Sequence, residues 1–167
     1  MPTKEYVRKF TNYTGIHNGV SFLIVSSDSY FLYDEKYKTV KWTSYILLSK
    51  EMFEDCSQDV KDEIFLELIE DKNDPFGYPR YPYSRSDILT SIKFHGGISY
   101  YDIKTQYGDK YVKIGCDYTH DGEEGIKYSL EDVVWDIKKA IDSLIALVPD
   151  IKVKDEFTGQ YVPVTKV

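Results

Sequence analysis

Short runs of apolar, β-branched and aromatic residues dominate the first third of the chain. The clearest is Val20–Ser26, a continuous apolar run that starts just after Asn18-Gly19. A run of this length between turn-forming residues predicts a buried strand. The residue pattern also predicts strands at residues 5–11 and 42–48, and a shorter strand at residues 30–33. These patterns predict a sheet that is built early in the chain.

Two later stretches have the periodicity of amphipathic helices, and each begins with a capping residue. The first covers residues 58–71, with Ser57 as its N-cap. The second covers residues 130–147. Ser129 and Asp132 give its start a capping-box pattern, and Pro149 ends it. The expected core positions are Val60, Ile64, Phe65, Leu68 and Ile69 in the first helix, and Leu130, Val133, Val134, Ile137, Ile141, Leu144, Ile145 and Val148 in the second.

Residues 98–116 predict a β-hairpin with its turn at Gln106–Asp109. A turn centred on Tyr107 and Gly108 sets Ile103 opposite Val112, Tyr101 opposite Ile114 and Ser99 opposite Cys116. All six side chains then share one side of the pleat, which supports this register.

Strands cluster before and between the two helices, without regular strand–helix alternation. We therefore expect an α+β fold, a mainly antiparallel sheet with two principal helices packed on one face. Residues 1–150 are expected to form a single α+β domain. Residues 151–167 are expected to form a C-terminal tail with a short strand at 160–162.

Composition narrows the function classes. The formal charge of −7 argues against general binding of nucleic acid. No apolar stretch is long enough for a membrane span or typical of a signal peptide. The two cysteines, Cys56 and Cys116, form no CxxC pattern, so a reducing cytosol is expected. The chain has 16 tyrosines, which suit half-buried sheets as well as binding surfaces.

Polar residues bracket the predicted hairpin. His95, Gly96 and Gly97 precede its first strand, whereas Asp117, His120 and Asp121 follow its second. Extending the register sets His95 opposite His120, so two imidazoles and two carboxylates would converge. Such a set can ligate a divalent metal or act as an acid–base pair. Three readings stay open: structural hydrogen bonds, ligand binding without metal, and a metal or catalytic site with His95, Asp117, His120 and Asp121.

A second candidate site is aromatic. Residues 73–83 hold three prolines and a glycine and predict a long loop. Its Arg80 and Tyr81, together with Trp42 and Tyr45, could line a ligand wall. Arg80 and Arg85 could contact a phosphate. The alternative is ordinary packing of sheet aromatics. Cys116 on a core-facing strand is expected to be inert.

The segments His95-Gly96-Gly97-Ile98-Ser99-Tyr100 and Ile114–His120, followed by an amphipathic helix, resemble a family of small phage and prophage proteins. That family has an HGG(L/I)(T/S)(Y/F) motif and then a GFDxAH-like motif. The resemblance covers roughly residues 75–147, and this chain departs from it at Cys116 and Thr119. Its members are mostly uncharacterised. The resemblance implies a phage accessory protein, often a counter-defence factor, in the host cytoplasm.

These observations lead to one leading hypothesis and two alternatives. The leading one is a phage-encoded accessory protein that binds a small phosphorylated or nucleotide-like ligand without turnover. Its expected ligand-binding residues are His95, Gly96, Gly97, Asp117, His120, Trp42, Arg80 and Tyr81. The alternatives are a metal-dependent hydrolase using the His/Asp cluster, and a protein that inhibits a host factor. A divalent metal is the one cofactor suggested, and a homo-oligomer is left open.

Overall fold

The computed structural model describes residues 5–31, 34–66, 82–118 and 127–164. Its strands, in chain order, are β1 (Tyr6–His17), β2 (Val20–Phe31), β3 (Asp34–Ser49), β4 (Tyr100–Gln106), β5 (Asp109–Asp117), β6 (Lys152–Lys154) and β7 (Tyr161–Pro163). Its helical segments are η1 (Lys50–Phe53), α1 (Gln58–Ile64), η2 (Pro82–Arg85), α2 (Asp87–Ser91) and α3 (Leu130–Leu147).

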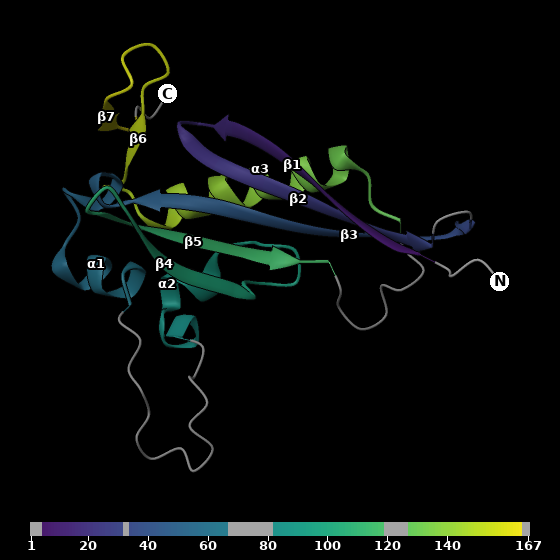
Figure 1. The fold of residues 1–167 in the computed structure, drawn as a ribbon. Coiled ribbons are helices and arrows are strands. Elements are labelled where there is room, and N and C mark those ends of the chain that lie inside the picture. Colours follow the sequence, from purple (N-terminus) through teal and green to yellow (C-terminus); the bar gives the residue numbers. More distant parts are fainter. Residues whose placement is uncertain (1–4, 32–33, 67–81, 119–126, 165–167) are drawn as a thin grey trace.

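The main sheet has five antiparallel strands in the order β1-β2-β3-β5-β4 (Figure 1). The first predicted strand is longer than expected and reaches His17. Of the short strand expected at residues 30–33, residues 30 and 31 belong to β2, and residues 32 and 33 lie outside the described residues. A long β1–β2–β3 meander therefore replaces several short strands.

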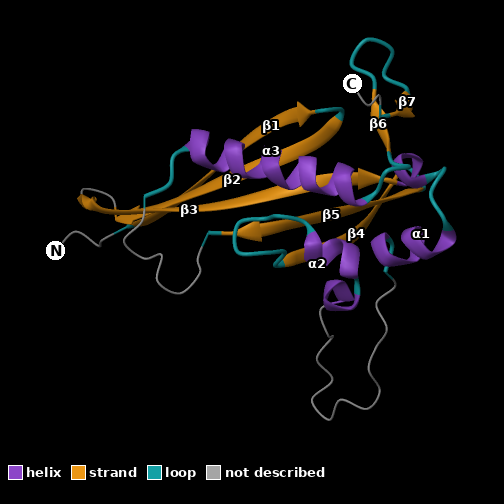
Figure 2. Cartoon of the chain, turned by 180° about the vertical axis from the view of Figure 1, so that it is seen from behind, coloured by secondary structure: helices purple, strands orange, loops and turns teal. Residues whose placement is uncertain are grey.

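One face of this sheet forms the hydrophobic core. Strand alternation directs Ile24, Ile46 and Ile114 to the same side, and all three are fully buried. Figure 2 shows α3 lying across the strands on this side, with α2 beside it. The expected α+β fold, with two principal helices packed on one face of an antiparallel sheet, is confirmed.

The long helix α3 begins and packs as predicted. Ser129 Oγ accepts a hydrogen bond from Asp132 N at 3.2 Å, and Asp132 Oδ2 accepts one from Ser129 N at 2.9 Å. Its fully buried side chains are Val133, Ile137, Ala140, Ile141 and Leu144. The helix contacts β2 and β3, so it covers the centre of the sheet.

The predicted helix at residues 58–71 ends earlier, at Ile64. A partly buried tyrosine explains this end. The Tyr101 hydroxyl donates to Ile64 O at 2.7 Å and accepts from Leu66 N at 2.8 Å. It thereby satisfies backbone groups that a continuing helix would have paired. Of the other expected core positions, Leu68 and Ile69 lie outside the described residues.

The predicted hairpin register is confirmed. Ile103 pairs with Val112, and Tyr101 pairs with Ile114. The expected pairing of Ser99 with Cys116 falls outside this register, because Ser99 N donates at 2.9 Å to O of Gly115, the residue that pairs with Tyr100. The turn residue Tyr107 has a φ of 53°, as a tight two-residue turn requires.

The C-terminal segment is anchored on the β1–β2 turn. Lys154 N donates to Gly19 O at 2.9 Å, and Ile151 is fully buried. The predicted strand at residues 160–162 corresponds to β7, which pairs with β6 in a hairpin of its own. Figure 1 shows this hairpin projecting beyond the main sheet.

Candidate functional site

His95 belongs to a tightly packed aromatic and polar cluster rather than to an open loop. Its imidazole stacks on the Tyr118 ring, with centroids 4.2 Å apart and planes inclined by 9°. The Tyr128 ring meets the imidazole edge-on at 5.3 Å, and the Tyr128 hydroxyl lies 3.4 Å from His95 Nε2. His95 Nδ1 lies 3.7 Å from Asp136 Oδ2. We call His95, Tyr118, Tyr128 and Asp136 the His95 cluster.

The cluster joins three separate parts of the chain, since Tyr128 and Asp136 both belong to the stretch around the start of α3. Tyr118 directly follows β5, Asp136 is on α3, and His95 precedes β4. The Tyr118 hydroxyl donates to Asp136 Oδ2 at 2.7 Å. Trp42 on β3 adds two bonds, since its Nε1 donates to Tyr128 O and its O accepts from Tyr118 N, both at 3.1 Å. The cluster therefore fastens α3 to the sheet.

The residues of the His95 cluster are largely shielded from solvent, and this burial changes the pKa of Tyr118. Tyr118 is 6% exposed, whereas the side chains of His95 and Asp136 are 21% and 27% exposed. Burial, and then the hydrogen bond to Asp136, raise the pKa of Tyr118 far above its ordinary value. The phenol therefore stays protonated and remains a donor to Asp136. The carboxylate in turn faces the imidazole and favours one orientation of that ring.

Sequence reasoning identified His95 and Trp42 but missed Asp136, Tyr118 and Tyr128. The signal for Asp136 is its position beside the buried stripe of α3, next to Ile137. Burying a carboxylate without a partner is costly, so a carboxylate beside an apolar stripe predicts a polar partner across the helix interface.

Asp117 lies apart from this cluster. It pairs with Thr43, between two core-facing positions, so its register position belongs to the face opposite Tyr118. Its backbone N donates to Ser99 Oγ at 3.2 Å. Gly96 and Gly97 both have left-handed φ values, 69° and 87°. A Cβ added at Gly97 would meet no atom of the described residues within 4 Å, so this bend is open.

Several predicted site residues lie outside the described part of the chain: Arg80, Tyr81, His120 and Asp121. The convergence of His95 with His120, and the ligand and metal roles given to these residues, stay predictions. Among the described residues, no three His, Cys, Asp or Glu side chains form a group that could hold a metal ion.

The aromatic wall expected from Trp42 and Tyr45 is not formed by these two residues. Trp42 pairs with Ser26 and faces the core, whereas Tyr45 pairs with Leu23 on the other face. They are three positions apart, an odd number, so strand alternation places them on opposite sides. On its own face, Tyr45 packs edge-on against Tyr100 at 5.1 Å, and Lys113 Nζ lies 4.1 Å from the Tyr45 ring.

Cys116 is 2% exposed, and its Sγ lies 3.4 Å from Ser44 Oγ. Burial raises the pKa of this thiol to about 11. A neutral, enclosed thiol is a poor nucleophile, in agreement with the inert role expected for it.

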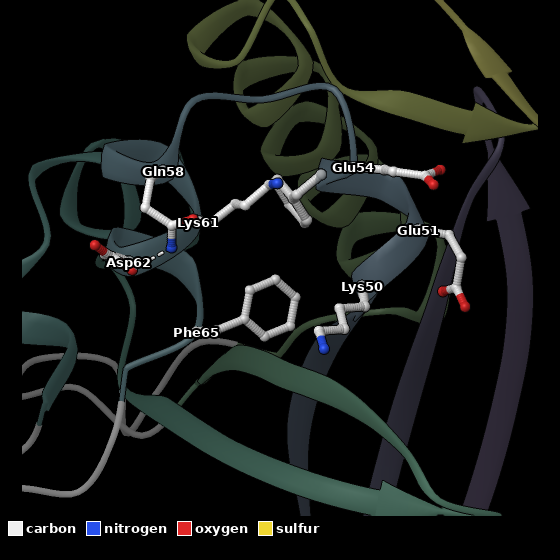
Figure 3. Close-up of a pocket in the computed structure, with 8 residues that line it drawn as sticks. Lys50, Glu51, Glu54, Gln58, Lys61, Asp62 and Phe65 are labelled. Atoms are coloured by element: carbon white, nitrogen blue, oxygen red, sulfur yellow. Dashed lines mark hydrogen bonds between the residues drawn. The ribbon is translucent and has the colours of Figure 1, made fainter.

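A pocket that sequence reasoning missed lies between η1 and α1. It has a volume of about 560 Å³, within the range of small-molecule sites. Its aromatic floor is the partly exposed Phe65 ring, which packs edge-on against the fully buried Phe53 with ring centroids 5.7 Å apart. Its remaining lining residues are Lys50, Glu51, Glu54, Gln58, Lys61 and Asp62. We call this hollow the Phe65 pocket (Figure 3).

The charges around the Phe65 pocket are not equivalent. Glu54 pairs with Lys152 at 3.4 Å, and Asp62 accepts from Gln58 at 2.9 Å. Figure 3 shows Glu51 turned away from the hollow, whereas Lys50 and Lys61 extend on either side of the Phe65 ring. Within the described ranges, neither of these two lysines forms an ion pair. The pocket therefore combines two available cations with an aromatic floor.

Comparison with known proteins identified no relative of this chain. No protein-family model matches the chain, and neither the curated proteins nor the solved structures gave a match. The resemblance to phage proteins therefore stays a prediction. No helix in the described ranges combines the length and apolar character needed to cross a membrane.

Proposed function

We propose that this protein binds, without turnover, a small anionic ligand that carries an aromatic or apolar group, and that the Phe65 pocket holds it. The observation that carries the proposal is the pairing of Lys50 and Lys61 with the Phe53–Phe65 floor in one hollow. A phosphorylated, nucleotide-like ligand fits this description. Its ring would pack on Phe65 and its phosphate would meet the two ammonium groups.

Physical reasons support both halves of this recognition. A lysine ammonium binds phosphate as a point charge, without demanding one geometry. Aromatic side chains bind a second ring through apolar burial and favourable ring contacts. Because the pocket is open to solvent, each contact alone is weak, so selectivity for a ligand with both groups is expected.

The resemblance to phage proteins supplies a setting for this activity. A phage accessory protein that binds a nucleotide-like host signal would lower its free concentration and blunt the response to it. This role is part of the proposal and rests on the resemblance alone.

The proposal is tested by titrating the protein with phenyl phosphate, inorganic phosphate and phenol in isothermal calorimetry. Phenyl phosphate should bind at least about tenfold more tightly than either part, a difference of about 1.4 kcal/mol. Equal affinity for phenyl phosphate and inorganic phosphate would leave the aromatic floor without a role and would refute the proposal. Adenosine monophosphate extends the series to a nucleotide.

Acid–base chemistry at the His95 cluster is a second candidate function. It is favoured by Asp136, which faces His95 Nδ1 in the way that a carboxylate orients a catalytic imidazole. His95→Gln keeps a hydrogen-bonding side chain but removes the titratable group. If this candidate holds, the variant should lose turnover in screens of hydrolysable substrates, although its melting temperature falls less than that of His95→Ala because glutamine keeps a polar group beside Asp136.

A further inference from the structure

The tip of the β6–β7 hairpin exposes a phenylalanine completely. Phe157 is 100% exposed, and the two residues before it, Asp155 and Glu156, are acidic. A large apolar side chain that stands alone in solvent contributes nothing to the core of its own chain. Aromatic residues in such positions are typical anchors of protein contacts.

The turn presents this side chain in a fixed geometry. Asp155 Oδ1 accepts hydrogen bonds from Phe157 N at 2.8 Å and from Thr158 N at 3.2 Å. The backbone closes the loop, since Gly159 N donates to Asp155 O and Asp155 N donates to Gln160 O, both at 2.8 Å. A preorganised tip loses little conformational entropy on binding.

The base of the hairpin is fixed as well. Lys152 Nζ lies 3.4 Å from Glu54 Oε2 and 3.3 Å from Asp55 Oδ2, next to η1. The bond from Lys154 N to Gly19 O ties the same strand to the β1–β2 turn. The tip is therefore held away from the body rather than free to fold back. Its complete exposure also means that it does not fill the Phe65 pocket of its own chain.

The tip and the Phe65 pocket are complementary in chemistry. The tip offers one aromatic ring with two carboxylates beside it. The pocket offers an aromatic floor with Lys50 and Lys61 beside it. We infer that the tip of one copy, Asp155-Glu156-Phe157, docks in the Phe65 pocket of a second copy. The inference rests on the proposed function, because it names the occupant of the same pocket when no small ligand is bound.

This contact is heterologous, because it joins the hairpin tip of one copy to the Phe65 pocket of another. Reciprocal exchange of tips closes a dimer, whereas one-way repetition extends a chain of copies. A contact made by one anchor and two ion pairs is small, so association is expected to be weak and concentration-dependent. A small anionic ligand in the pocket would compete with the tip and release the copies.

The test is the mass of the full chain, measured by sedimentation equilibrium from about 1 µM to about 1 mM, a range that brackets weak association. The wild type should associate, and the association constant of Phe157→Ala should be at least about tenfold lower. Tyr107→Asn is the matched control. Tyr107 is 96% exposed at the turn of the other hairpin, and asparagine tolerates its left-handed φ.

A charge exchange makes the test specific. Lys50→Glu/Lys61→Glu should abolish association, and so should Glu156→Lys, which leaves the Asp155 hydrogen bonds of the turn intact. A mixture of these two variants should associate again, because the unchanged tip of the pocket variant can dock in the unchanged pocket of the tip variant. A wild type that stays monomeric at every concentration overturns the inference, and so does association that Phe157→Ala leaves unchanged.

The same variants separate this inference from the proposed function. Phe157→Ala should keep the affinity for phenyl phosphate, because the pocket is intact. If phenyl phosphate binds but the wild type does not associate, the inference fails and the proposed function stands. If association depends on Phe157 and phenyl phosphate does not bind, the small-ligand function fails.

Discussion

The imidazole of His95 lies flat against the ring of Tyr118, at a centroid distance of 4.2 Å. Because the Tyr118 hydroxyl also donates to Asp136 on α3, this stack is part of a continuous path from the loop before β4 to the helix. A residue expected to bind ligands at a hairpin mouth is thus also a structural link between helix and sheet.

Replacing His95 by alanine should therefore destabilise the protein. The change removes the stack on Tyr118 and leaves Asp136 and the Tyr128 hydroxyl without one neighbour. We expect a loss of about 1–3 kcal/mol in the free energy of unfolding, measured by urea denaturation. His17→Ala is the control, since His17 pairs at 2.9 Å with Asp142, which is 55% exposed. Such a surface pair is worth about 0–1 kcal/mol. Equal losses in the two variants would contradict this view.

Stability should fall in alkaline solution because of Cys116. Its pKa is raised from 9.0 in the unfolded chain to about 11 in the folded protein, mainly by burial. Protonated thiol is favoured in the folded state, so this contribution is complete below pH 9 and is lost as the pH rises toward 11. The loss amounts to about 2–3 kcal/mol for a shift of this size. The pKa values of Tyr101 and Tyr118 are also raised by burial, so these residues too lower stability above about pH 10, and the measurement is the difference between wild type and Cys116→Ala. Parallel pH profiles for the two proteins would refute the assignment.

Truncation of the α3 core should be costly. Ile137 and Ile141 are 1% and 0% exposed, so replacing either by alanine leaves a cavity under the helix. Each variant should lose about 2–5 kcal/mol in chemical denaturation. Lys138→Ala, on the exposed side of the same helix, should change stability by less than about 0.5 kcal/mol. Shifts well below 1 kcal/mol for both isoleucines would contradict the packing of α3 on the sheet.

Gly19 should tolerate no side chain. Its φ is 77°, and a Cβ built there would lie 2.7 Å from both Lys154 O and Val153 Cβ. Gly19→Ala should therefore strain the turn and push β6 away. We expect a loss of more than about 1 kcal/mol, together with faster hydrogen exchange at Lys154 N. Gly97→Ala shares the left-handed φ but meets no neighbour in the described part of the chain, so it isolates the strain from the clash. Unchanged exchange at Lys154 in Gly19→Ala would exclude this account of the anchor.

Features with a local origin could be predicted from the sequence. The β4–β5 register follows from one tight turn and the alternation that it fixes, and the start of α3 follows from Ser129 and Asp132. Features that depend on tertiary contacts could not. The end of α1 is set by Tyr101, which is 37 residues away from Ile64 in sequence. The five-residue helix α2 is too short for a periodic pattern.

The same distinction applies to the candidate sites. His95 drew attention because of its neighbours in sequence, but its partner Asp136 comes from a distant helix. The Phe65 pocket exists only because η1 and α1 lie side by side, and no motif in either segment indicates a ligand. From the sequence alone, Lys50 and Lys61 cannot be told from ordinary surface lysines, because the sequence does not show whether nearby carboxylates pair with them.

The central claim is that the Phe65 pocket binds an anion with an aromatic group. Its most direct test is calorimetric titration of phenyl phosphate into the wild type, Lys50→Glu/Lys61→Glu and the charge-matched control Lys110→Glu/Lys138→Glu. The pocket variant should lose at least about tenfold in affinity, whereas the control should keep the wild-type value within about twofold. An equal loss in both variants, or none in the pocket variant, would show that the ligand binds elsewhere or through net charge alone.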